Sequence, residues 1–315
     1  MMERNVDTDS NICMRDGLDE RESGLKGLKE ILRGESCALT RAYRENLEGV
    51  IGILDSEPII SRIDAKRAVI IGDTHGDIET FCRVLERYPI AEYTYVMMGD
   101  YVDRGSKSTE LLALLLMNKM RYPHNIFMIR GDHESPIGSI YPQQFPDEFL
   151  GKLNDRQTLY GLYNELFPKM PIAAVLNNRY FIVHGGISIG GYDIGELSDM
   201  KKVRDPESND IILQMLWNDP SRNRNNEYSS RGDGIYKFGY DIADDFLRRN
   251  DLNMIIRGHE HRSGGYDLNN GNIMTILTTR AYRGDGQYIV RIDGERFDVI
   301  DVGMRDCTED KKPEI

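Results

Sequence analysis

A pattern of an apolar run followed by a polar loop occurs three times between residues 68 and 134 and limits the possible folds. A short apolar run, typical of a buried strand, ends each time in a loop that combines glycine with Asp or His, and segments with helical spacing separate the runs. This alternation predicts a βαβαβ unit, in which crossover helices join parallel strands, and hence an α/β fold. The three apolar runs are Ala68–Ile71, Tyr93–Met98 and Asn125–Ile129.

The second half of the chain favours strands. Two apolar runs, Arg179–Val183 and Asn253–Ile256, are followed closely by His184 and His259, again beside glycine. Because ligands of parallel sheets bind beyond the carboxyl ends of the strands, we expect these loops to form a site. Further predictions are strands over 273–278, 287–292 and 296–301, helices over 25–54 with a break at Gly34 and over 241–249, and a long loop over 222–231.

Charge and apolar patterning exclude two classes of protein. Of the 315 residues, 40 are Lys or Arg and 52 are Asp or Glu, which gives a net charge of −12. Nucleic-acid binding needs clustered positive charge, so we expect no nucleic-acid partner. The longest apolar run, Leu111–Met117, is far shorter than the roughly 20 residues of a membrane-spanning helix, so we expect no membrane partner.

The ends of the chain and its cysteines indicate a compartment and a domain plan. The first residues are polar and show no signal-peptide pattern, and the four cysteines form no CxxC pair. We therefore expect reduced thiols and a cytoplasmic protein. We also predict a disordered extension over 1–24, one domain over 25–304 and a charged tail over 305–315.

Six Asp and His residues at the ends of predicted strands are candidate metal ligands. A mixed Asp/His set suits divalent metals of intermediate softness, such as Mn²⁺, Fe or Zn²⁺. Six ligands are too many for one catalytic metal with an open position, but they fit two metals about 3.5–4 Å apart that share a carboxylate, as in hydrolytic phosphoryl transfer. Each loop alone is typical of an ordinary turn, so the prediction depends on their conjunction. The candidates are Asp73, His75, Asp100, Asp132, His184 and His259.

The motifs GDTHG, GDYVDRG, RGDHE, HGG and RGH, in this order, resemble the phosphoprotein phosphatase (PPP) family of metal-dependent Ser/Thr phosphatases, types 1, 2A and 2B. The resemblance extends roughly over residues 49–293 and includes MPIAAV, LWNDP and RGDGIYKFG. It implies a calcineurin-like metallophosphoesterase fold, with a central β-sandwich flanked by helices, in which the βαβαβ motif carries a dinuclear metal site. The region 25–304 would then be a single metallophosphatase catalytic domain.

The resemblance also implies roles for individual residues. Asp73 and His75 would bind the first metal and Asp100 would bridge, while Asp132, His184 and His259 would complete the second metal. The implied reaction is hydrolysis of phosphoserine and phosphothreonine proteins by in-line attack of a metal-bridging hydroxide. The implied cofactors are two divalent ions, Mn²⁺ or Fe/Zn, and the implied partners are phosphoproteins and regulatory subunits. Of the remaining residues, His133 would be the general acid, Asp103 would orient it, and Arg104, Arg231 and Tyr282 would bind substrate.

Two features depart from the family pattern. Asp132 stands where the family has Asn, so we expect tighter metal binding and weaker attraction of phosphate. The loop that overhangs the site in the family reads TTRAYRG here, with Arg280 and Arg283 at positions that are neutral in the family. We expect these two arginines to add positive potential over the site and to steer anionic phosphopeptides.

Two alternatives stay open at this point. The first is a metallophosphoesterase that acts on dinucleoside polyphosphates or other small phosphate esters, although GDYVDRG and RGDGIYKFG favour a protein phosphatase. The second is a non-catalytic phosphoprotein-binding scaffold, which would typically have lost a ligand or the acid His133. The spacing of His261 from His259 would allow it to reach the edge of the site, but a surface position is favoured.

Overall fold

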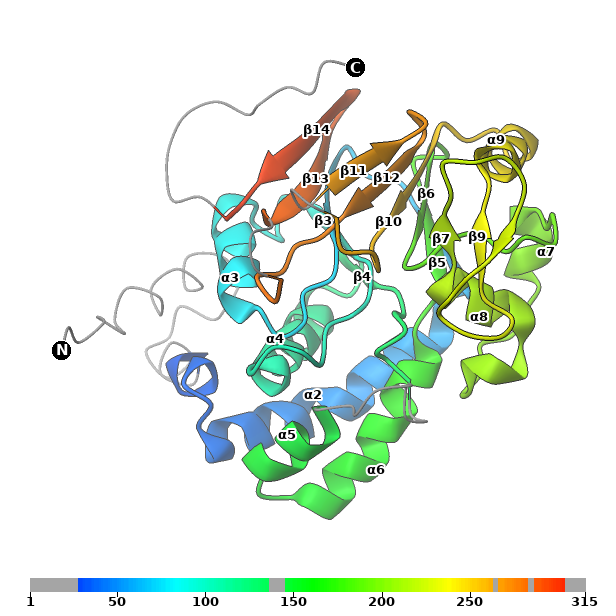
Figure 1. Cartoon of the computed structure of the whole chain (residues 1–315). Helices are drawn as coiled ribbons and strands as arrows, with labels where there is room; N and C mark the ends of the chain where they lie inside the picture. The colour runs from blue at the N-terminus through cyan, green and yellow to red at the C-terminus, as the bar shows by residue number, and fades with distance from the viewer. Residues whose placement is uncertain (1–27, 136–144, 263–265, 283–285, 304–315) are drawn as a thin grey trace.

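Two β-sheets lie at the centre of the computed structural model, which describes residues 28–135, 145–262, 266–282 and 286–303 (Figure 1). The six-stranded sheet has the order β1 (Ile60–Ile63), β5 (Ala173–Leu176), β6 (Tyr180–Val183), β10 (Met254–Arg257), β12 (Ile273–Ile276) and β11 (Tyr266–Asn269). The five-stranded sheet has the order β14 (Arg296–Asp301), β13 (Tyr288–Asp293), β2 (Arg67–Ile71), β3 (Thr94–Met97) and β4 (Ile126–Met128).

The two sheets pack face to face and form a β-sandwich, as predicted. Along β2, Ala68 and Ile70 belong to the core between the sheets, whereas Val69 and Ile71 belong to the core on the outer face. Because both faces of this strand are covered, all of these side chains are apolar, and the sequence shows a continuous apolar run rather than an alternation.

Helices cover the outer faces of both sheets (Figure 1). The layers are therefore helix, sheet, sheet and helix. The core on the outer face of the five-stranded sheet includes residues of α2 (Ser36–Ser56), α3 (Ile78–Arg87) and α4 (Ser108–Arg121). The helices α5 (Phe145–Lys152) and α6 (Arg156–Leu166) belong to the same core and pack on α4 and α2. Three helices pack with the six-stranded sheet: α7 (Ile194–Ser198), α8 (Asp210–Trp217) and α9 (Tyr240–Arg249). A small third sheet has the order β7 (Asp219–Pro220), β9 (Tyr236–Phe238) and β8 (Glu227–Tyr228).

The predicted βαβαβ unit is confirmed as β2, α3, β3, α4 and β4. The strands are parallel, with Ile70 opposite Val96 and Val96 opposite Phe127. In the other sheet, β6 and β10 also run parallel. Because parallel neighbours end at the same edge of a sheet, the loops after these strands lie together.

Other local predictions are confirmed in part. Gly34 interrupts the N-terminal helical region with a φ of +76°, between helical residues 28–32 and α2. The long loop predicted over 222–231 contains the short strand β8, so that prediction is wrong at 227–228. The strands β1 and β5 have no strong local signal, and they form by pairing Ile60 with Ala173 across the chain.

Some predictions concern the ends of the chain and its chemistry. The extension over 1–24 and the tail over 305–315 lie outside the described residues. Cys82 forms a disulfide bond, so the expectation of reduced thiols is wrong for Cys82. In the described part of the chain, no helix is long and apolar enough to cross a membrane.

Candidate metal centre

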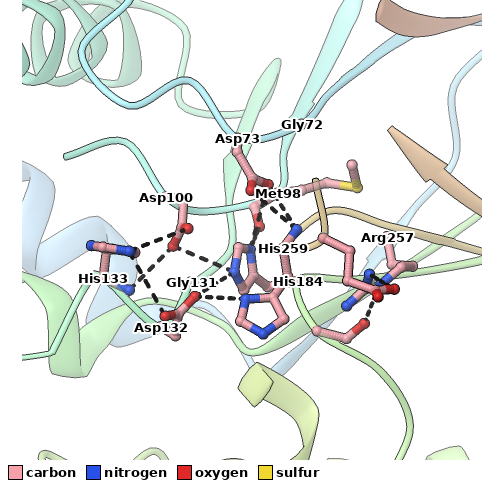
Figure 2. Close-up of polar contacts among 12 residues, drawn as sticks. Gly72, Asp73, Met98, Asp100, Gly131, Asp132, His133, His184, Arg257 and His259 are labelled. Carbon is pink, nitrogen blue, oxygen red and sulfur yellow. Dashed lines mark hydrogen bonds and ion pairs between the residues drawn. The ribbon is translucent and has the colours of Figure 1, made fainter. Parts of the chain in front are cut away.

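The loops after five strands carry the Asp and His ligand candidates. Figure 2 shows side chains of Asp73, Asp100, Asp132, His184 and His259 gathered in one cluster. The six predicted ligands are all buried, with at most 9% of any residue exposed. They come from both sheets: Asp73 and His75 follow β2, Asp100 follows β3, Asp132 follows β4, His184 follows β6 and His259 follows β10.

Four of these residues form one compact group. Asp100, Asp132, His184 and His259 each offer a ligand atom, and these atoms lie within 4.8 Å of one another. Asp132 Oδ1 is 2.8 Å from His184 Nε2 and 2.9 Å from His259 Nδ1. A cation bound among these oxygen and nitrogen atoms would have the mixed ligand set that the sequence predicts.

A second group shares Asp100 with the first. His75, Asp100 and His133 also offer atoms within 4.8 Å of one another. The shared carboxylate occupies the place that a bridging ligand would need. Asp73 belongs to neither group: its carboxylate accepts the backbone N–H of His259 at 3.0 and 3.1 Å. The assignment of Asp73 as a ligand of the first metal stays a prediction.

Backbone carbonyls orient two of the histidines. His75 Nδ1 contacts the Val102 carbonyl and His184 Nδ1 contacts the Met98 carbonyl, both at 2.8 Å. Each Nδ1–H donates to its carbonyl, so Nε2 is the ring nitrogen that faces the carboxylates, the orientation that metal-binding histidines have. Nε2 of His75 is buried and has no hydrogen-bond partner within the described ranges, although Asp100 Oδ2 lies only 3.4 Å away.

The buried carboxylates need positive charge nearby. Burial and the neighbouring carboxylate of Asp132 raise the pKa of Asp100 well above its ordinary value. Burial disfavours the charged form of His184, but Asp100 and Asp132 outweigh it and raise the pKa of His184 to about 10. A proton and a divalent cation are alternative ways to satisfy these carboxylates. The charge, the donor atoms and the unpaired Nε2 of His75 all fit divalent metal ions.

His133 lies at the accessible side of the cluster, with 11% of its side chain exposed. Its Nδ1 is 2.7 Å from Asp103 Oδ2, and the other Asp103 oxygen accepts the backbone N–H of Phe145 at 2.8 Å. Burial opposes a charge on His133, but Asp100, Asp132 and Asp103 outweigh it and raise the pKa of His133 to about 10. The predicted pairing of His133 with Asp103 is therefore present in the structure.

The loops that carry the site have unusual backbone conformations. The φ angles of His75, Asp100, Asp103, Arg104 and His259 all lie between 42° and 66°. This left-handed region is unfavourable for residues other than glycine, and such residues gather at functional sites. Close approach adds a further constraint, because a Cβ on Gly258 would lie 2.2 Å from Asp73 Oδ1.

The predicted substrate-binding residues surround this cluster. Arg104 lies with its guanidinium carbon 5.5 Å from the ring centre of Tyr282, and its NH2 group is 3.3 Å from His133 Nε2. Arg231 is held at its Nε by Asp219 Oδ2 at 2.6 Å, and about a third of its side chain is exposed. Both guanidinium groups are at least partly exposed, and their N–H groups suit the binding of an anion.

Arg280 does not lie free above the site, contrary to the expectation from the sequence. Its guanidinium is paired with Asp77 at 2.8 Å and also contacts Glu79. Two carboxylates therefore neutralise a charge that we expected to attract substrate. Arg283 lies outside the described residues. His261, by contrast, reaches the edge of the site: its side chain is exposed, and its ring centre is 4.9 Å from that of Tyr282.

Sequence reasoning missed three residues that support the site. Glu134 is buried and accepts the backbone N–H groups of Asp100, Tyr101 and Gly131 at 2.6, 2.8 and 3.0 Å. Arg257 is also buried and donates to Asp219 at 2.9 Å, so that Asp219 is shared between Arg257 and Arg231. These residues lie inside the motifs RGDHE, RGH and LWNDP, which was the signal available in the sequence. The motifs did not indicate which contacts the residues make.

Comparison with known proteins agrees with this geometry. Residues 66–263 match the family model described as calcineurin-like phosphoesterase. A probable serine/threonine-protein phosphatase of Encephalitozoon cuniculi is 30% identical over 87% of this chain and 61% of its own length. Serine/threonine-protein phosphatase T of Aspergillus oryzae is 31% identical over 84% of this chain and 55% of its own length. The chain thus spans somewhat more than half the length of these relatives.

A solved structure supports the same fold. The chain is similar to a protein serine/threonine phosphatase from Saccharomyces cerevisiae, described as similar to human phosphatase PP5, with a TM-score of 0.75 and 27% identity. The match covers 88% of this chain and 89% of that one. Together with the β-sandwich and the buried Asp/His cluster, these matches confirm the predicted fold, and this chain belongs to the calcineurin-like phosphoesterase family.

Proposed function

We propose that this protein is a metal-dependent serine/threonine protein phosphatase, a hydrolase of phosphoric monoesters. The observation that carries the proposal is the His133–Asp103 pair, 2.7 Å apart, at the accessible side of a buried Asp/His cluster. The names of the relatives and of the similar solved structure support this reading.

The six ligand candidates would hold two divalent cations, with Mn²⁺ as the first choice and Fe or Zn²⁺ as the others. When bound, the cations would supply positive charge that stabilises the phosphoryl group in the transition state and lowers the pKa of water at the centre. The proposed ligands are Asp73, His75, Asp100, Asp132, His184 and His259.

The protein's own groups would perform the remaining tasks. Arg104 and Arg231 would bind the phosphate oxygens through their N–H groups, which suit an anion with several acceptors. His133 would donate the proton on Nε2 to the leaving serine or threonine oxygen. Asp103 would hold the His133 ring through Nδ1, so that Nε2 faces the substrate. Tyr282 would close the site on the side of Arg104.

Replacement of His133 tests this proposal. With Mn²⁺ present, His133→Asn should lower kcat for a phosphoserine peptide by about 10²–10⁴-fold, because proton transfer to the leaving group is lost. The matched control His124→Asn changes an exposed histidine elsewhere and should leave kcat unchanged. Wild-type kcat in His133→Asn would overturn the assignment. The proposed function would be overturned if the wild-type protein hydrolysed dinucleotides but not phosphopeptides. It would also be overturned if the wild-type protein bound the peptide stoichiometrically without turnover.

The substrates, partners and location follow from the proposed activity. Phosphoproteins would be the substrates, and regulatory subunits would select among them. We propose that the protein is cytoplasmic, although the disulfide at Cys82 is typical of an oxidising compartment. Cell fractionation with an antibody to the protein tests the location, and recovery in an oxidising compartment would contradict it.

A further inference from the structure

We propose that Asp77 and Arg280 form a positioning pair, which holds the overhanging loop so that the ring of Tyr282 stays beside Arg104. This inference rests on the proposed function, because it explains how residues of that site are kept in place. It assigns Arg280 to the support of the loop rather than to the attraction of substrate.

Arg280 is attached to the Asp77 carboxylate by several hydrogen bonds. Its NH2 group donates to Asp77 Oδ1 at 2.8 Å, its Nε donates to Asp77 Oδ2 at 3.0 Å, and its backbone N–H donates to the same oxygen at 2.9 Å. The guanidinium also contacts Glu79. A forked pair of this kind fixes both the distance and the orientation of the two groups. Because the backbone of residue 280 takes part, the attachment holds the loop itself.

The partner Asp77 is fixed in turn. Its carboxylate caps α3 by accepting the backbone N–H of Thr80 at 3.1 Å and the Thr80 hydroxyl at 2.7 Å. Only 5% of the Asp77 side chain is exposed. Residue 77 also follows the β2 loop that carries Asp73 and His75, so the pair connects the overhanging loop to the same loop that supplies ligand candidates.

The base of the overhanging loop has its own anchor. Thr278 Oγ1 accepts the backbone N–H of Gly72 at 2.9 Å and donates to the Tyr288 carbonyl at 2.6 Å. Arg280 is therefore the next fixed point along the loop, and Tyr282 follows two residues later. Without the pair, three residues would separate Tyr282 from the hydrogen bonds of Thr278.

Tyr282 is in contact with functional residues on two sides. Its ring centre lies 6.2 Å from that of His75 and 4.9 Å from that of His261. The Arg104 guanidinium carbon lies 5.5 Å from the same ring centre, and Arg104 NH2 reaches His133 Nε2 at 3.3 Å. A displaced Tyr282 would thus leave Arg104, a proposed phosphate ligand, without the ring that packs against it.

A double-mutant cycle tests the pair in the full chain loaded with Mn²⁺. Asp77→Asn keeps the helix cap but removes the charge, and Arg280→Gln removes the fork. Each variant should raise KM for a phosphoserine peptide by about 5-fold, with kcat changed less than about 2-fold. KM of the double variant should be no higher than that of either single variant. Arg280→Lys should be intermediate, since an ammonium keeps the charge without the fork.

Two peptides separate positioning from attraction of charge. Arg280→Gln should raise KM equally for a peptide with acidic flanks and one with neutral flanks. A larger increase for the acidic peptide would overturn the positioning role and support attraction of substrate by Arg280. The positioning role would also be overturned if the fold-increase in KM of the double variant equalled the product of the two single increases, because the free-energy effects of independent residues add.

A measurement without turnover keeps the inference separate from the proposed function. Amide hydrogen exchange over residues 278–282 should be faster by about tenfold or more in Arg280→Gln and Asp77→Asn, because a local attachment is lost. Wild-type exchange in both variants would overturn the pair even if the enzyme is active. The matched control Arg44→Gln removes an exposed ion pair to Asp155 and should change neither exchange nor KM.

Discussion

At the scale of single residues, the charge at position 132 is the departure closest to the chemistry. Asp132 Oδ1 contacts both His184 and His259, and an Asn oxygen could occupy the same place. The Asp132 carboxylate therefore adds negative charge to the centre, although its contacts with His184 and His259 do not require that charge. An ionised Asp also cannot donate a hydrogen bond to phosphate, whereas an Asn amide can.

Asp132→Asn should therefore improve the binding of anions. We expect kcat/KM for a phosphoserine peptide to rise by about 3- to 10-fold and phosphate to inhibit more strongly by a similar factor, which corresponds to about 0.7–1.4 kcal/mol. Steady-state kinetics at saturating Mn²⁺ measure both quantities, because saturation compensates for a weaker metal ligand. Unchanged or poorer kcat/KM and phosphate inhibition would contradict the expectation. Asp155→Asn, at a partly exposed carboxylate that is paired with Arg44, is the matched control.

At the scale of elements, Glu134 connects the loops after β3 and β4. Its buried carboxylate accepts three backbone N–H groups, from Asp100, Tyr101 and Gly131. The two strands pair in parallel, but their loops carry different ligand candidates. The geometry between Asp100 and Asp132 consequently depends on a buried side chain that is not itself a ligand candidate.

Glu134→Gln should destabilise the protein. A glutamine amide turns an NH2 group toward backbone donors, which leaves at least one buried N–H unsatisfied and costs about 1–3 kcal/mol in the free energy of unfolding. Urea denaturation at fixed Mn²⁺ measures this change. For comparison, Glu295→Gln alters an exposed side chain and should stay within about 0.5 kcal/mol of wild type. Equal stabilities of the two variants would show that the Glu134 contacts contribute little.

At the scale of the whole molecule, the candidate metal centre joins the two sheets. Asp73, His75, Asp100 and Asp132 follow strands of one sheet, while His184 and His259 follow strands of the other. A cation bound here contacts residues that unfolding separates. Metal binding should therefore stabilise the entire sandwich rather than one loop.

Removal of metal should lower the stability of the whole domain. Mn²⁺ at 100 times its dissociation constant should add about 2.7 kcal/mol to the free energy of unfolding relative to the chelated protein. Differential scanning calorimetry with Mn²⁺ and with a chelator would measure this as a rise in Tm of several degrees. Asp100→Asn, which removes the shared carboxylate charge, should reduce the rise. The same Tm with and without Mn²⁺ would contradict metal binding at this site.

The local features of this protein could be predicted from its amino-acid sequence. The apolar runs of β2, β3, β6 and β10 predicted strands because both faces of each strand are buried, and the residues after them were identified as ligand candidates. These features depend on neighbours along the chain, so a sequence pattern records them. The pairing of His133 with Asp103 was also expected, although only from the family resemblance.

Contacts between side chains that are distant in the chain became known only from the folded structure. The pairing of Arg280 with Asp77, which reversed our expectation for that arginine, joins residues far apart in the chain. The same is true of Arg257 and Asp219, and of β1 and β5. Charge alone does not specify a partner, because an arginine near a site can bind substrate or a carboxylate of its own chain. The packing of loop against helix decides between them, and packing is a property of the folded molecule.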